Sequence, residues 1–179
     1  MESSLTPFLS SVGGVPIHPL VVHAAVILVP LSALLALPVA LRATWRRRFG
    51  WPVVIVAVLA WPAIPASVMS GRELAEDTYG AELGGLIAEH ERLGEQLPLI
   101  SGLFVLATVL LVALGTLGDR WWLTAPSDSG AAGQTPPWWR LGLAALAVAV
   151  VGMGIWTVVQ VTLVGHLGAE STWGHLVGN

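Results

Sequence analysis

The chain has 179 residues, of which 55% are hydrophobic and only 11% are charged. In soluble domains about a quarter of the residues are charged. This composition therefore predicts an integral membrane protein whose main partner is the lipid bilayer. The sequence has no cysteine, which excludes disulfides, iron–sulfur clusters, thiolate zinc sites and covalently attached haem on this chain. Lysine is absent and the arginines form no basic stripe, so we expect no nucleic acid partner.

Four apolar runs predict an all-α fold, a bundle of four transmembrane helices in one integral membrane domain, residues 1–179. Residues 1–17 are the predicted N-terminal tail, and the predicted spans are residues 19–41, 49–69, 97–117 and 141–164. Each run has about 20 residues, which at about 1.5 Å per residue matches a hydrocarbon core of about 30 Å. Pro62 and Pro65 lie inside the second run and are expected to kink it.

Residues 81–96, before the third span, are polar but patterned. One stripe at helical spacing carries Leu83, Leu86, Ile87, His90, Leu93 and Leu97. The charged residues lie largely off this stripe, so the segment predicts an amphipathic helix that runs into the third span. His90 is therefore expected to face the bundle interior.

Arginine placement predicts the orientation of the chain in the membrane. Six of the arginines follow spans one and three, namely Arg42, Arg46, Arg47, Arg48, Arg120 and Arg140. The opposite side holds Arg72 and Arg92. By the positive-inside rule both termini are extracytoplasmic, and residues 119–140 form a cytoplasmic loop flanked by paired tryptophans.

Two segments after spans two and four resemble each other. Gly71–Gly80 aligns with Gly165–Gly174 without a gap, sharing the outer glycines, an Ala-Glu pair and a Thr. The fold is therefore expected to consist of two repeated helical hairpins. Arg72 stands where the second copy has His166, four residues before Glu76 and Glu170 respectively. We expect an Arg72–Glu76 ion pair in the first copy and a ligand pair in the second.

All five histidines are predicted to gather at the outer side of the membrane: His18, His23, His90, His166 and His175. Polar side chains at membrane depth suggest a function, and imidazole is a common ligand of metals and of haem iron. His18 and His23 are about 140° apart around an ideal helix, so they are not expected to share one ion. His23 lies deeper in its span and is the better interior candidate.

The first functional hypothesis is a haem b protein for electron transfer rather than an enzyme. Two imidazoles from different helices, His23 or His90 against His166, would bind the iron, and Arg72 or Arg92 would hold a propionate. We expect a redox protein as partner, and a homo-oligomer is the other assembly considered. No phosphate loop, serine nucleophile elbow or zinc-protease motif is present in the sequence.

Two alternatives stay open. In the first, three of the histidines, with Glu170, bind zinc, copper or iron as a non-haem metal centre; the candidate ligands are His18, His23, His90, His166, His175 and Glu170. In the second, the protein is a scaffold subunit of a membrane complex without a cofactor. The histidines are then helix-end polar groups bonded to backbone carbonyls.

Three features together resemble a known family: Ile17-His18-Pro19-Leu20-Val21-Val22-His23, the histidine before span three, and Gly165-His166-x-Gly168-Ala169. They are similar to the bacterial membrane domain called domain of unknown function 2231, from about residue 15 onward. The resemblance implies a four-helix domain of the bacterial cytoplasmic membrane without an assigned activity. Some relatives are fused to Rieske-type or cytochrome-c-type domains, which implies redox work. The family's aromatic-x-His-Gly ending is matched only in part by Trp173-Gly174-His175.

Overall fold

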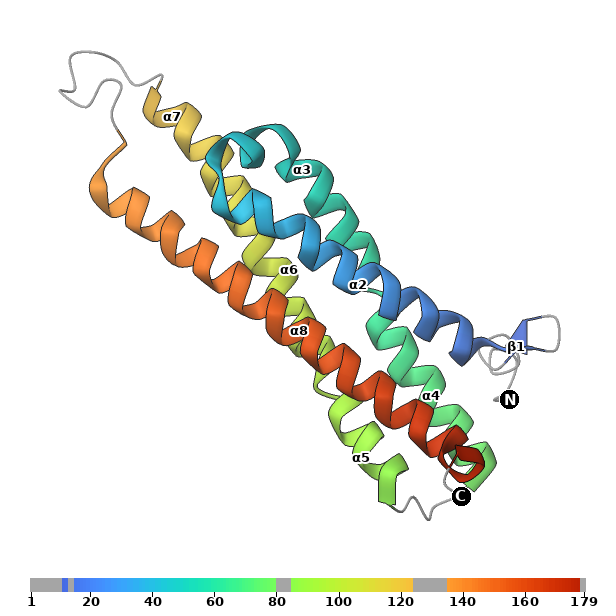
Figure 1. Ribbon diagram of the computed structural model, residues 1–179. Helices are drawn as coiled ribbons and strands as arrows, with labels where there is room; N and C mark the ends of the chain where they lie inside the picture. Colours follow the sequence, from blue (N-terminus) through green and yellow to red (C-terminus); the bar gives the residue numbers. More distant parts are fainter. Residues whose placement is uncertain (1–10, 13–14, 80–84, 124–134, 178–179) are drawn as a thin grey trace, which may run out of the picture.

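The computed structural model describes residues 11–12, 15–79, 85–123 and 135–177. A short antiparallel pair of strands, β1 (Ser11–Val12) and β2 (Val15–Pro16), precedes the first helix. The remaining described elements are helices, which form one elongated bundle (Figure 1). They are α2 (Ile17–Leu41), α3 (Ala43–Ala60), α4 (Ala63–Tyr79), α5 (Gly85–Gly94), α6 (Leu97–Ala113), the π-helical turn η1 (Leu114–Gly118), α7 (Asp119–Leu123) and α8 (Pro137–Val177).

Four helical segments are long and apolar enough to cross a membrane, which confirms the predicted number of spans. They are Ile17–Leu41, Ala43–Glu76, Gly85–Trp121 and Pro137–Ser171. All four predicted spans lie inside these segments. Of the predicted amphipathic segment, residues 81–84 lie outside the described residues and Gly85–Gly94 form α5. Residues 95–96 form a turn, after which α6 begins at Leu97.

The structure changes the predicted limits of the loop at residues 119–140 and locates the kink that was expected in the second span. The predicted loop, residues 119–140, is helical at both ends, because α6 continues through η1 and α7 to Leu123 and α8 already begins at Pro137. Proline is favoured at the first helical position, where its missing N–H costs nothing. The expected kink in the second span is present as a break between α3 and α4 at Trp61-Pro62, since Pro62 cannot donate a backbone hydrogen bond.

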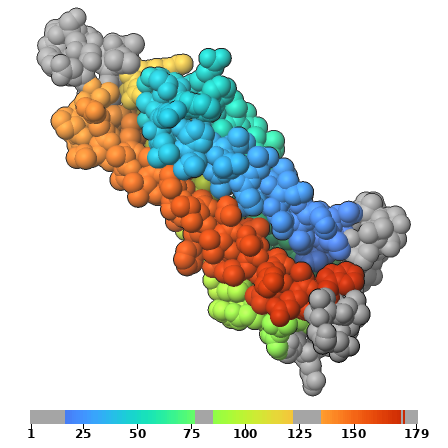
Figure 2. Space-filling view, viewed as in Figure 1, coloured from blue at the N-terminus to red at the C-terminus, as the bar shows by residue number. Residues whose placement is uncertain are grey.

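The helices pack so that α2 contacts α3, α4 and α8, while α6 contacts α8 and α3. The space-filling view shows α2 and α8 side by side along one face (Figure 2). The start of α2, the ends of α4 and α8, and α5 lie at one end of the bundle (Figure 1), here called the histidine end after His18 and His90. The end of α2, the start of α3, α7 and the start of α8 lie at the other, the arginine end, named after Arg46 and Arg140.

The interior combines aliphatic side chains with Phe104 and buried serine and threonine residues, and the outside of the bundle is apolar. Buried residues from α2, α6 and α8, among them Val39, Leu111 and Val150, pack into one continuous cluster. Large apolar side chains such as Leu59 and Val148 are more than 70% exposed. An exposed apolar surface of this kind is typical of a helical bundle that spans a membrane.

Candidate functional site

His18 begins the first membrane segment and points at α4. Its Nδ1 lies 3.1 Å from the backbone oxygen of Ser67 and 3.1 Å from Oγ of Ser70. The ring packs on the backbone of α4 at Gly71, where an added Cβ would lie 2.9 Å from Cε1 of the imidazole. A larger residue at this position would force the imidazole to move, because real Cβ atoms essentially never come so close.

His90 makes the same kind of contact between α5 and α8. Its Nδ1 lies 2.8 Å from the backbone oxygen of Val164. A Cβ added at Gly168 would lie 2.9 Å from Cε1 of this imidazole. Both rings are half-buried, and the prediction that His90 faces the bundle interior is confirmed.

The two contacts share one geometry. In each, the accepting carbonyl lies four residues before the glycine, Ser67 before Gly71 and Val164 before Gly168. A carbonyl accepts only from N–H, so Nδ1 carries a proton in both contacts, and in the neutral form of the ring Nε2 keeps its lone pair. Within the described ranges neither Nε2 has a hydrogen-bond partner.

His23 and His166 lie on the outside of the bundle. The prediction that His23 faces the interior is wrong, because its side chain is exposed and its Nδ1 bonds to Pro19 O of its own helix at 2.6 Å. Its separation from His18 of about 140° around the helix explains this, since one of the two must then face away. The imidazole of His166 is 77% exposed.

His166 and Glu170 do share a face of α8, as predicted, with Nε2 3.9 Å from a carboxylate oxygen. This pair contacts the surroundings of the bundle and not the two interior imidazoles. The structure therefore does not bring His166 together with His90. The side chain of His175 lies outside the described residues.

The contacts also shift the register of the two similar segments. The sequence alignment pairs Gly71 with Gly165, but a Cβ at Gly165 would meet nothing within 4 Å. The glycine under an imidazole in α8 is Gly168, three residues further on. In its packing against an imidazole, Gly71 therefore corresponds to Gly168 and not to Gly165.

The arginines of this end bind carboxylates on α5 and in the turn that follows it. Arg72 of α4 pairs, at 3.7 Å, with Glu91 of α5 and also with Glu95, one residue beyond the end of α5. The predicted ion pair of Arg72 with Glu76 is absent from the described part of the chain, where the guanidinium pairs instead with these two carboxylates. Arg92 pairs with Glu89 one turn earlier in its own helix, at 2.6 Å.

The side chains that could act as metal ligands limit which cofactor the histidine end can bind. Among the residues described here, no three of His, Asp and Glu converge as a metal-binding group. A zinc, copper or iron centre with three protein ligands, as the sequence suggested, is not assembled by these residues. What remains at this end is a pair of half-buried imidazoles, His18 and His90, each bonded to a backbone carbonyl of a neighbouring helix.

Sequence reasoning missed the residues that hold the two imidazoles. Ser67, Gly71, Val164 and Gly168 are backbone partners, so their chemistry gives no signal. The available signal was the spacing of small residues, Ser67-x-x-x-Gly71, which allows close approach to a membrane helix. No family model, curated protein sequence or solved structure among those compared matches the chain.

Proposed function

We propose that this multi-pass membrane protein transfers electrons and binds haem b through His18 and His90. The observation that carries the proposal is the pair of imidazoles on separate membrane segments, each fixed through Nδ1 to a backbone carbonyl. Metal-bound histidines are typically oriented in this way, since a hydrogen bond from the other ring nitrogen sets the tautomer and raises the basicity of the ligand. His18 thus takes the place that the sequence gave to His23 or His166.

The chemistry of the pair favours electron transfer over catalysis. When bound, haem supplies one-electron redox chemistry, and two imidazoles leave no open coordination position for oxygen or substrate. Arg72 is the nearer candidate for a propionate, because it already reaches from α4 to α5 at this end of the bundle. A propionate there would compete with Glu91 and Glu95. A redox protein is the expected partner.

The proposal also covers the orientation of the chain in the membrane and the kind of membrane in which it lies. The concentration of arginines at the arginine end supports a cytoplasmic location for that end, with both termini extracytoplasmic. The motifs similar to domain of unknown function 2231 support a bacterial cytoplasmic membrane. The equal geometry of the two histidine–glycine contacts supports an internal repeat of two hairpins.

The second candidate is a scaffold subunit without a cofactor. It is favoured because His18 and His90 already form contacts between helices. Each imidazole bonds to a backbone carbonyl of a neighbouring helix and packs against a glycine of that helix. In that case Nδ1 is the functional atom of each ring, and Nε2 has no role.

An absorption spectrum separates the two candidates. The full chain is purified in mild detergent from haem-supplied cells, and spectra are recorded before and after dithionite, with metal analysis of the same sample. A stoichiometric Soret band that shifts on reduction supports the proposal. A colourless, metal-free protein rejects it in favour of the scaffold, and stoichiometric metal without porphyrin points to the non-haem alternative.

A further inference from the structure

A cavity of about 460 Å³ lies at the arginine end of the bundle, far from the two imidazoles. The end of α2, the start of α3, α7 and the start of α8 surround it. Its polar lining includes Arg46, Asp119, Trp139 and Arg140, and α8 adds an aliphatic wall with Leu143. The cavity thus has a charged, mainly cationic side and an apolar side.

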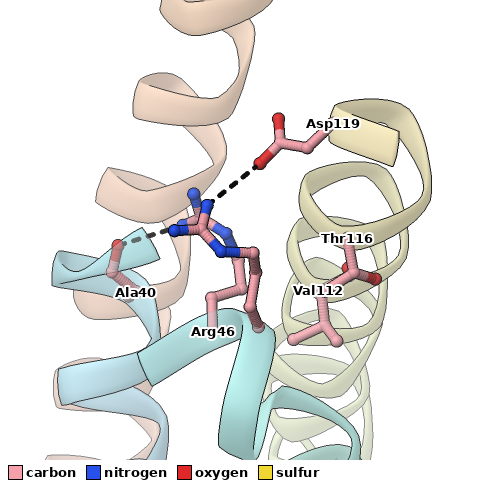
Figure 3. Close-up of polar contacts among 6 residues, drawn as sticks. Ala40, Arg46, Val112, Thr116 and Asp119 are labelled. Atoms are coloured by element: carbon pink, nitrogen blue, oxygen red, sulfur yellow. Dashed lines mark hydrogen bonds and ion pairs between the residues drawn. The ribbon is translucent and has the colours of Figure 1, made fainter. Parts of the chain in front are cut away.

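Arg46 is a buried cation with few partners. It is only 8% exposed, and its Nη1 donates to the backbone oxygen of Ala40 at 3.5 Å. Its Nε has no partner in the described structure. Figure 3 shows Arg46 with Ala40 and the nearby Asp119. The carboxylate of Asp119 forms its ion pair with Arg47, at 3.8 Å. A buried guanidinium with one long hydrogen bond is poorly compensated for its lost hydration.

Trp139 adds a second donor. The indole Nε1 is buried and, in the part of the chain that is described, has no hydrogen-bond partner. Two glycines of η1 hold these side chains in place: Arg46 packs against Gly115, and Trp139 packs against Gly118. A Cβ added at either glycine would lie closer to the packed side chain than real Cβ atoms essentially ever do. Both side chains are therefore closely packed against η1.

The surroundings supply both positive charge and lipid. Arg140 lines the cavity, and most other arginines of the sequence belong to the same end: Arg42, Arg47, Arg48 and Arg120. The helix that forms the aliphatic wall also exposes large apolar residues, with Leu141 71% and Val148 73% exposed. An acyl chain along α8 would thus be continuous with a head group in the cavity.

We propose that this cavity binds the phosphate group of an anionic phospholipid from the surrounding bilayer. The phosphodiester oxygens accept from the side chains of Arg46, Trp139 and Arg140, and the attached glycerol and acyl groups lie along α8. Basic pockets between membrane helices are suited to such head groups, because charge and hydrogen bonds act together in a site of low polarity. A volume of about 460 Å³ is sufficient for a head group.

The test is native mass spectrometry of the full chain in detergent, titrated with phosphatidylglycerol or with phosphatidylcholine. We expect saturable binding of the anionic lipid and weaker binding of the zwitterionic lipid. Trp139→Phe removes the N–H but keeps an aromatic ring, and Arg140→Gln changes an exposed side chain, so both variants should fold. Each is expected to weaken binding of phosphatidylglycerol roughly tenfold, the loss of one hydrogen bond to a charged group.

Arg48→Gln is the matched control, because Arg48 is exposed and does not line the cavity. Equal loss in Arg48→Gln and Arg140→Gln would overturn the proposal, since general surface charge would then explain binding. Equal affinity for the two lipids would also overturn it. Inorganic phosphate is added in a separate arm: if it occupies the cavity and phosphatidylglycerol does not displace it, the ligand is a free anion and the lipid assignment is wrong.

Discussion

Gly168→Ala should destabilise the bundle, whereas Gly165→Ala, one turn earlier in the same helix, should not. At Gly168 the new Cβ would lie 2.9 Å from Cε1 and 3.2 Å from Nδ1 of His90. The ring has to move, and that movement weakens its 2.8 Å bond to Val164 O. At Gly165 the new Cβ meets nothing within 4 Å.

The size of the difference follows from three contributions. Overpacking at Gly168 costs about 1–3 kcal/mol, and loss of the His90 hydrogen bond costs about 1 kcal/mol. Alanine in place of a helical glycine gains about 0.5–1 kcal/mol at either position. Gly168→Ala should therefore lower the free energy of unfolding by about 1–3 kcal/mol, and Gly165→Ala should leave it unchanged or raise it slightly.

Intrinsic fluorescence measures this directly, because the chain has 9 tryptophans. Both variants are unfolded by SDS titration from a mild detergent, alongside the wild type. The combination of Gly168→Ala with His90→Ala removes the clashing ring, so its cost should be less than the sum of the two single costs. Equal stability of Gly165→Ala and Gly168→Ala would refute the assigned contact.

Three further predictions concern other parts of the molecule. Gly115→Ala should lower the free energy of unfolding by about 1–3 kcal/mol, since its Cβ would collide with Arg46; a neutral result in the SDS titration would contradict the packing at η1. Arg72→Gln should reduce stability only slightly and only at low salt, because its ion pairs to α5 are solvent-exposed; a large, salt-independent loss would be inconsistent with this. Single cysteines are informative because the chain has none: Glu170→Cys should react with an impermeant maleimide in intact cells and Trp121→Cys only after permeabilisation, and the reverse pattern would invert the proposed orientation.

Much of the fold could be predicted because hydropathy and proline chemistry act locally. The four membrane segments follow from apolar length, and the break at Pro62 follows from its missing N–H. The inward position of His90 followed from the spacing of its apolar neighbours. The chain continued as helix to Leu123 where a loop was expected, because the end of an apolar run does not fix the end of a helix.

The candidate site was only partly predictable because it depends on helix rotation. His23 lies further into the first apolar run than His18, so it was the favoured interior ligand. The rotation of α2, however, turns His18 toward α4 and His23 outward. The alignment of the two glycine segments favoured His166, but the imidazole that reaches α8 comes from α5. Arg72 could not be paired correctly from local spacing, since its partners lie on a different helix.

Substitutions of histidine by asparagine test most directly whether both His18 and His90 bind the haem iron. The amide of asparagine lies near the position of Nδ1 and can donate to Ser67 O or Val164 O, but nothing replaces Nε2. His18→Asn and His90→Asn thus keep the contacts between helices and remove the ligands. His23→Asn and His166→Asn change exposed histidines and serve as controls.

The measurement is the electron paramagnetic resonance spectrum of the ferric protein after haem titration in each of the four variants. The account predicts a low-spin six-coordinate signal in the wild type, in His23→Asn and in His166→Asn, and its loss in His18→Asn and His90→Asn. A low-spin signal that survives in either interior variant, or that disappears in His166→Asn, would contradict ligation by both residues.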